Sequence, residues 1–248
     1  MSTIRIESHE NVAVLRLDNG VTNAISQELV DELSAALATI RSDGRGLVLA
    51  GGDKFFSIGL DLPRLLQLSR EQMERFWQRF DQVLLDLYTF PAPTAAAING
   101  HAVAGGTILA LTADCRFISD GRNLMGLNEA NIGVPVPYLA DLLLRQLVDE
   151  NAANEIVFGG ELIAPEKARA IGLVNDILPE EALENHAIES VRAVSVKPRH
   201  AIRQIMENRT ERVNRRFERN RDVKRAAMMD IWFRPEVQQM LNEAAKKF

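Results

Sequence analysis

Two glycine-bearing stretches of this 248-residue sequence have the composition of loops that bring backbone N–H groups close to a ligand. The first, INGHAVAGGTILAL at 98–111, places Gly105 and Gly106 between a short apolar run and a helix-like segment. Its spacing is close to that of a nucleotide-phosphate loop, but Gly106 stands where that loop requires lysine. The sequence therefore argues against nucleotide hydrolysis. It favours a smaller, partly negative ligand atom, such as a thioester carbonyl oxygen that becomes an enolate.

The second stretch, FFSIGLDL at 55–62, follows a strand and opens a helix. Gly59 allows a sharp turn, and the N–H of Leu60 is expected at the positive end of a helix that Asp61 caps. Two such turns can aim two N–H groups at one oxygen atom. Glycine turns are common, so each loop alone is equally consistent with a purely structural turn.

Three segments together resemble the crotonase (enoyl-CoA hydratase/isomerase) superfamily: FFSIGLDL, the pair Asn23-Ala24, and INGHAVAGGTILALTADCRF. The similarity runs over nearly the whole chain. It implies an α/β fold built as a spiral of ββα units, with a helical C-terminal trimerisation region. It also implies a coenzyme A thioester whose carbonyl oxygen is held by the N–H groups of Leu60 and Gly105. Ala104 replaces a glycine that many relatives have.

The resemblance also implies where acid–base chemistry resides. Hydratases of this family carry two glutamates, and at the first of these positions the sequence has Ile108. At the second, in GLNEANIG at 126–133, it has Glu129. Hydration needs water to be deprotonated while a second group delivers a proton. Moving a double bond from C3 to C2 needs one base, and Glu129 can serve both carbons.

The pattern is most similar to the Δ3,Δ2-enoyl-CoA isomerase branch, which also pairs one glutamate with an aliphatic residue. The resemblance makes Glu129 the catalytic base, although without it the residue reads as an exposed loop carboxylate. Coenzyme A is part of the substrate, and no separate cofactor is expected. The resemblance implies substrate contacts from Asn23, Ala24, Ile58, Ile108 and Asn128.

Other reactive side chains lie in less informative places. Cys115 sits in an apolar stretch and is expected to be a buried thiol. No metal centre is expected, because the histidines lie apart without ligand spacing: His9, His101, His186 and His200. Candidates for contacts to the coenzyme A phosphates are Lys54, Lys246 and Lys247.

The elements that must position these residues alternate for about 180 residues, and helices alone follow. We predict a core at 1–190 for thioester binding and catalysis, and a helical oligomerisation region at 191–248. Strands are predicted at 4–7, 12–17, 47–50, 95–98, 116–119 and 173–178. Helices are predicted at 26–41, from 61, at 70–88, 105–113, 137–148 and 164–172, and from 180 onward.

The bulk composition fits a globular protein: 46% of residues are hydrophobic, 25% are charged and the net charge is −5. The acidic balance makes nucleic-acid binding unlikely as a general function. No signal peptide or membrane span is expected, and the single cysteine fits a reducing compartment, so we predict a cytoplasmic protein. In Arg209–Arg225, eight basic and three acidic residues predict a solvated helix face with Val213, Phe217 and Val223 packing inward.

The resemblance thus implies a homotrimer, or a dimer of trimers, that isomerises 3-enoyl-CoA in fatty-acid β-oxidation. One alternative on the same fold is a 2-enoyl-CoA hydratase that uses Glu129 alone, or another enolate-forming acyl-CoA enzyme. An alternative of another class is a catalytically silent protein that binds coenzyme A esters, or RNA through Arg209–Arg225.

Overall fold

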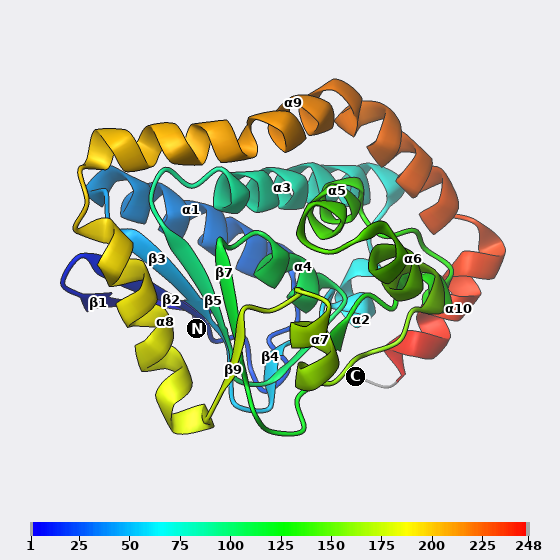
Figure 1. Cartoon of the computed structure of the whole chain (residues 1–248). Coiled ribbons are helices and arrows are strands. Elements are labelled where there is room, and N and C mark those ends of the chain that lie inside the picture. Colours follow the sequence, from blue (N-terminus) through cyan, green and yellow to red (C-terminus); the bar gives the residue numbers. More distant parts are fainter. Residues whose placement is uncertain (1, 247–248) are drawn as a thin grey trace.

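The computed structural model describes residues 2–246, in which two β-sheets are surrounded by helices (Figure 1). Lys247, one of the predicted phosphate contacts, lies outside the described residues. The larger sheet has the order β1-β2-β3-β5-β7-β9, in which β1 and β2 form an antiparallel hairpin and all other pairs are parallel. Its strands are β1 (Ile4–His9), β2 (Val12–Leu17), β3 (Gly46–Ala50), β5 (Thr94–Ile98), β7 (Cys115–Ser119) and β9 (Asp176–Leu178).

The smaller sheet has the order β4-β6-β8, with parallel pairing throughout. Its strands are β4 (Phe55–Ser57), β6 (His101–Val103) and β8 (Met125–Gly126). Along the chain, β3, β5 and β7 of the larger sheet are each followed by one of these short strands. Helices come after each pair, so the predicted spiral of ββα units is confirmed.

Helices of the spiral lie between and beside these strand pairs. Ser26 caps α1 by accepting a hydrogen bond from the Leu29 N–H at 3.2 Å, as its position in the sequence predicted. Asp61 caps α2 in the same way, with Pro63 in the first turn. The helices are α1 (Gln27–Asp43), α2 (Leu62–Leu65), α3 (Arg70–Tyr88), α4 (Gly105–Leu111), the 3-10 helix η1 (Glu129–Ile132), α5 (Tyr138–Leu147), α6 (Glu150–Gly159) and α7 (Pro165–Ala170).

The central strands of the larger sheet, β2, β3, β5 and β7, are buried on both faces, which explains why they are mostly apolar. On β2, Val12 and Val14 belong to one core cluster with α8 (Glu180–Ser195), whereas Ala13 and Leu15 belong to the main core. Figure 1 shows α8 lying along one side of this sheet.

The C-terminal region is a 34-residue helix, α9 (Arg199–Trp232), followed by α10 (Pro235–Ala245). In Figure 1 α9 runs along one side of the molecule, and it packs on α3 and α5. The predicted boundary between 190 and 191 falls inside α8. Phe217, Met229 and Trp232 of α9 are part of the main core. The region 191–248 is therefore not separate from the catalytic core that was predicted for 1–190.

Several predicted details differ from the structure. Val223 does not pack inward but is 74% exposed, whereas Val213 and Phe217 are buried as predicted. The last strand begins at Asp176 rather than at 173. The three strands of the smaller sheet were not predicted, because strands of two or three residues carry no periodic signal. The ten-residue helix α6 was also not predicted.

The basic segment is partly turned toward the protein. Arg209 forms an ion pair with Asp114 at 2.7 Å and lies over the ring of Tyr88, and Arg225 lies 3.5 Å from Asp81. Because Arg209 and Arg225 are engaged in these ion pairs, fewer basic side chains of the segment are available to contact an RNA than the sequence suggested. Within the described residues, every helix is too short or too polar to cross a membrane.

Candidate active site

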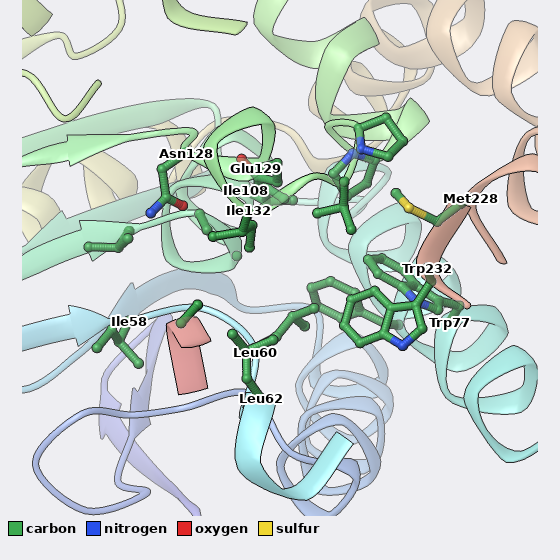
Figure 2. A pocket seen from close by; sticks show the side chains of 18 of the residues that line it. Ile58, Leu60, Leu62, Trp77, Ile108, Asn128, Glu129, Ile132, Met228 and Trp232 are labelled. Atoms are coloured by element: carbon green, nitrogen blue, oxygen red, sulfur yellow. The ribbon is translucent and has the colours of Figure 1, made fainter. Parts of the chain in front are cut away.

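An apolar cavity of about 260 Å³ lies where the loop before α2, the start of α4 and η1 meet side chains of α3 and α9. Figure 2 shows the side chains that line it. Six of the eight residues predicted to act on the substrate line this cavity: Ile58, Leu60, Gly105, Ile108, Asn128 and Glu129.

The loop before α2 is held so that one N–H group remains free. The Ile58 N–H donates to the Thr22 carbonyl at 2.9 Å, and the Asp61 N–H donates to the Ile25 carbonyl at 3.0 Å. Between them, the Leu60 N–H has no acceptor among residues 2–246. Because its neighbours on both sides are fixed, this donor keeps its direction when a ligand arrives.

Gly105 provides the second free donor. It is the first residue of α4, so its N–H has no partner within the helix, and no other acceptor lies in the described part of the chain. The two glycine loops also touch: a Cβ added to Gly59 would lie 3.0 Å from the Gly105 nitrogen. This backbone-to-backbone approach brings the two loops with free N–H groups to the same wall of the cavity.

The residues on either side of Gly105, Ala104 and Gly106, each meet a different steric requirement. A Cβ on Gly106 would lie 2.2 Å from the Ser57 carbonyl oxygen, so this glycine lets α4 pack on β4. Ala104 has φ 47° and ψ −112°, a conformation that glycine adopts far more readily than alanine. Both glycines allow close packing, since a Cβ on Gly105 would lie 2.8 Å from the Ile25 Cδ1 and 3.1 Å from the Gly59 Cα, and Gly105 in addition presents a free N–H group.

Asn23 and Ala24 do not line the cavity. Asn23 is 1% exposed, and its amide nitrogen donates to the carbonyls of Phe55 (3.2 Å) and Phe56 (3.3 Å). Its side-chain oxygen accepts from the Asn19 N–H at 2.8 Å. The side chain thus fixes β4, which leads into the loop of Leu60. A contact of Asn23 and Ala24 to coenzyme A remains a prediction.

Glu129 opens η1 and is buried, with 6% of its surface exposed. Its Oε2 has no hydrogen-bond partner within residues 2–246. Burial raises the pKa of this carboxyl to about 7, because a carboxylate loses its hydration in an apolar site. Within residues 2–246, no other residue that lines the cavity carries an acid or a base. Glu129 can therefore both accept and return a proton near neutral pH.

Ile108 is buried in the first turn of α4 and lines the same cavity (Figure 2). Its apolar side chain offers no place to hold a water molecule by hydrogen bonds. Asn128, next to Glu129, is half-buried, and its side-chain amide has no hydrogen-bond partner in the described chain. The arrangement can thus polarise a carbonyl group, remove a proton from the adjacent carbon and keep water away.

Other polar or reactive side chains either form hydrogen bonds that hold the fold or lie away from the cavity. The His101 Nδ1 accepts from the Leu124 N–H at 3.0 Å, and the Ser57 hydroxyl donates to the Asn23 carbonyl at 2.7 Å. Lys54 and Lys246 do not line the cavity. Cys115 is half-buried, and burial raises the pKa of its thiol.

The far wall of the cavity was missed from the sequence. Met228, Trp232 and Ala244 come from α9 and α10, and none of them was among the site residues expected from the sequence. One signal was present: the run AAMMDIW at 226–232 is apolar within an otherwise charged helix. Such a run predicts burial but does not say against what.

Comparison with known proteins gives a consistent result. A family model described as enoyl-CoA hydratase/isomerase matches residues 7–244. The human mitochondrial enoyl-CoA delta isomerase 1 is 31% identical over 194 residues, which are 77% of this chain and 64% of that protein. A putative enoyl-CoA hydratase of Thermus thermophilus is 34% identical over 197 residues, covering 77% of this chain and 76% of that one. The crystal structure of human mitochondrial delta3-delta2-enoyl-CoA isomerase superposes with a TM-score of 0.94 at 26% identity, covering 99% of this chain and 97% of that one.

Proposed function

Because this chain belongs to the enoyl-CoA hydratase/isomerase family, we propose that it moves the double bond of 3-enoyl-CoA thioesters to the 2-trans position. One observation carries the proposal. Among the residues that the structure describes, Glu129 is the sole acid or base lining the cavity, and buried Ile108 stands where the resemblance places the second carboxylate of the hydratases. The reaction needs one group that takes a proton and gives it back, which is what a solitary carboxyl with a pKa of about 7 provides.

The thioester oxygen accepts hydrogen bonds from the N–H groups of Leu60 and Gly105. The Glu129 carboxylate removes a proton from C2, and the electron pair of that C–H bond forms a C1–C2 double bond. The carbonyl π pair moves onto the oxygen, where the two N–H donors stabilise the enolate. No solvent reorganisation is needed at this moment, because the backbone hydrogen bonds around Leu60 already fix the donor.

The second half returns the same proton. An electron pair on the enolate oxygen restores the carbonyl group, and the π pair of the C1–C2 double bond moves to form the C2–C3 double bond. The π pair of the original C3–C4 double bond then forms the bond at C4 to the proton that Glu129 returns. Atoms and electrons balance without a cofactor, and the carboxylate is regenerated. Ile108 supports this outcome over hydration, because its side chain offers a water molecule no hydrogen-bond partner.

The proposal is tested by giving the protein 3-enoyl-CoA and 2-enoyl-CoA in separate assays. We expect fast isomerisation of the first and slow hydration of the second. Glu129→Gln should lower isomerase turnover by roughly 10²–10⁴, the usual contribution of a positioned acid–base group, with an unchanged circular dichroism spectrum. Hydration as fast as isomerisation, or near-normal turnover of a folded Glu129→Gln protein, would contradict the single-base mechanism.

A further inference from the structure

The cavity has a partly exposed end and a closed end. In Figure 2, Ile58 and Asn128 lie on one side, and Trp77, Trp232 and Met228 lie on the opposite side. Ile58 and Asn128 are half-buried, whereas the other three are buried. The coenzyme A part of a thioester is far too large for about 260 Å³, so it must remain at the exposed end. An acyl chain then extends past Glu129 toward the closed end.

A second cavity, of about 320 Å³, lies directly behind the closed end. The two cavities share four lining residues: Trp77, Pro135, Pro137 and Met228. The second cavity continues between α5 and α9, with an apolar part and a charged part. Its apolar part is formed by Tyr138, Phe217, Ala227 and Ile231, and its charged part by Asp81, Asp141, Arg221, Lys224 and Arg225.

Of the four shared residues, Met228 is the one whose side chain can move readily. Trp77 is held by aromatic neighbours, with ring centroids 5.8 Å from Phe80 and 6.5 Å from Trp232. The prolines have fixed rings. Met228 has an unbranched, adaptable side chain and is 7% exposed at the boundary of both cavities.

We propose that Met228 is the partition that sets the length of acyl chain this site accepts. The inference rests on the proposed function, since it requires an acyl-CoA in the first cavity. Chains that end before Met228 are enclosed by the first cavity alone. Longer chains have to displace the Met228 side chain and enter the second cavity.

Binding of saturated acyl-CoAs tests this without turnover, because these compounds lack the double bond that reacts. Titration calorimetry gives the Kd for a series of increasing chain length. In the wild-type protein we expect affinity to rise by about fourfold per buried methylene and then to stop rising at the length that meets Met228.

We call the chain length at which the affinity stops rising the break. Two substitutions should move this break in opposite directions. Met228→Ala joins the cavities and shifts the break to longer chains. The gain per added methylene should then fall below fourfold, because the charged side chains of the second cavity oppose burial of an alkyl tail. Met228→Phe fills the boundary with a rigid ring and shifts the break to shorter chains.

The chain offers a matched control in Met229→Ala. Met229 is the next residue of α9 and is 0% exposed, but it lines neither cavity. Its substitution should leave the break at the wild-type length. Acetyl-CoA, which does not reach Met228, should bind all four proteins equally and so reports correct folding.

The outcomes separate the two proposals. A break at the same length in the wild type and in both Met228 variants overturns the role of Met228 and leaves the proposed function intact. An equal shift in Met229→Ala also overturns it, because the effect would then come from general loosening of the core. Failure to bind any acyl-CoA overturns the proposed function itself.

Discussion

Glu129 combines two properties that are usually separated in a folded protein: it is nearly fully buried, and one carboxyl oxygen lacks a partner. An ionised carboxylate that is buried without a partner has a high free energy. The raised pKa lowers this cost, because the carboxyl group stays protonated up to a higher pH. The same shift makes the residue useful. At neutral pH its protonated and ionised forms are of similar free energy, which is the condition for a group that must alternate between them.

The pH dependence of the reaction should report this carboxyl directly. Only the ionised form can remove the C2 proton, so kcat/KM should rise with pH and level off above the pKa of about 7. One unit below this value, at pH 6, the rate constant should be about tenfold below the plateau. Steady-state kinetics between pH 5 and 9 measure the profile. A profile that is flat from pH 5 to 8 would mean that the base has an ordinary carboxyl pKa.

At the scale of elements, the decisive contact is between the loop before α2 and the start of α4. Asn23 holds β4, Gly106 lets α4 approach it, and Gly59 lies against Gly105. Ala104 opposes the arrangement, because its φ of 47° costs a side-chain-bearing residue of the order of 1–3 kcal/mol.

Ala104→Gly should therefore stabilise the protein. Relief of backbone strain outweighs the greater freedom that glycine has in the unfolded chain, and we expect a net gain of roughly 1 kcal/mol. Urea unfolding at constant pH measures it. Ala102→Gly, at a buried position of β6 outside the left-handed region, serves as the control and should destabilise. Equal losses of stability in both variants would show that Ala104 is not strained.

Across the whole molecule, a second buried carboxyl joins α3 to α9. Asp81 lies 3.5 Å from Arg225, but desolvation outweighs this attraction and raises the pKa of Asp81 to about 7. Asp81 and Glu129 therefore both bind protons more tightly in the folded than in the unfolded state. Their contribution to stability is full below the unfolded-state values near 4 and is lost as the pH rises through 7.

We predict that the free energy of unfolding falls between pH 5 and pH 8, because the folded-state carboxyls lose their protons over this range whereas the unfolded-state ones have largely lost theirs. For each carboxyl the loss should be at most of the order of 3 kcal/mol. Asp81→Asn and Glu129→Gln should each make the fall smaller, and the double variant should make it smallest. Urea titrations at the two pH values provide the measurement. A wild-type protein that is equally stable at both pH values would contradict the raised pKa values.

Local features of the fold and site were predictable, whereas long-range ones were not. Ser26 and Asp61 identify helix starts because a cap acts within its own turn, and the glycines mark both loops for the same reason. Asn23 was predicted to touch the substrate, yet its amide binds backbone carbonyls, and a short motif cannot distinguish these two uses. Met228 and Trp232 were missed because they lie about 100 residues from Glu129, and helical periodicity does not identify the opposing surface. Val223 was misplaced for that reason too.

The closing of the cavity by the last two helices bears on how the molecule is made. A ribosome delivers Leu60, Gly105 and Glu129 long before Met228, Trp232 and Ala244, and domains form from the N-terminus onward during synthesis. Until α9 emerges, Trp77 and Phe80 on α3 lack the surface that covers them, and the nascent chain exposes an open apolar trough. Because α10 contacts both α2 and η1, the reactive groups are enclosed last. The cavity is therefore complete only after α9 and α10 have been synthesised, and a product that stops before α9 would bear Glu129 without the wall that these two helices supply.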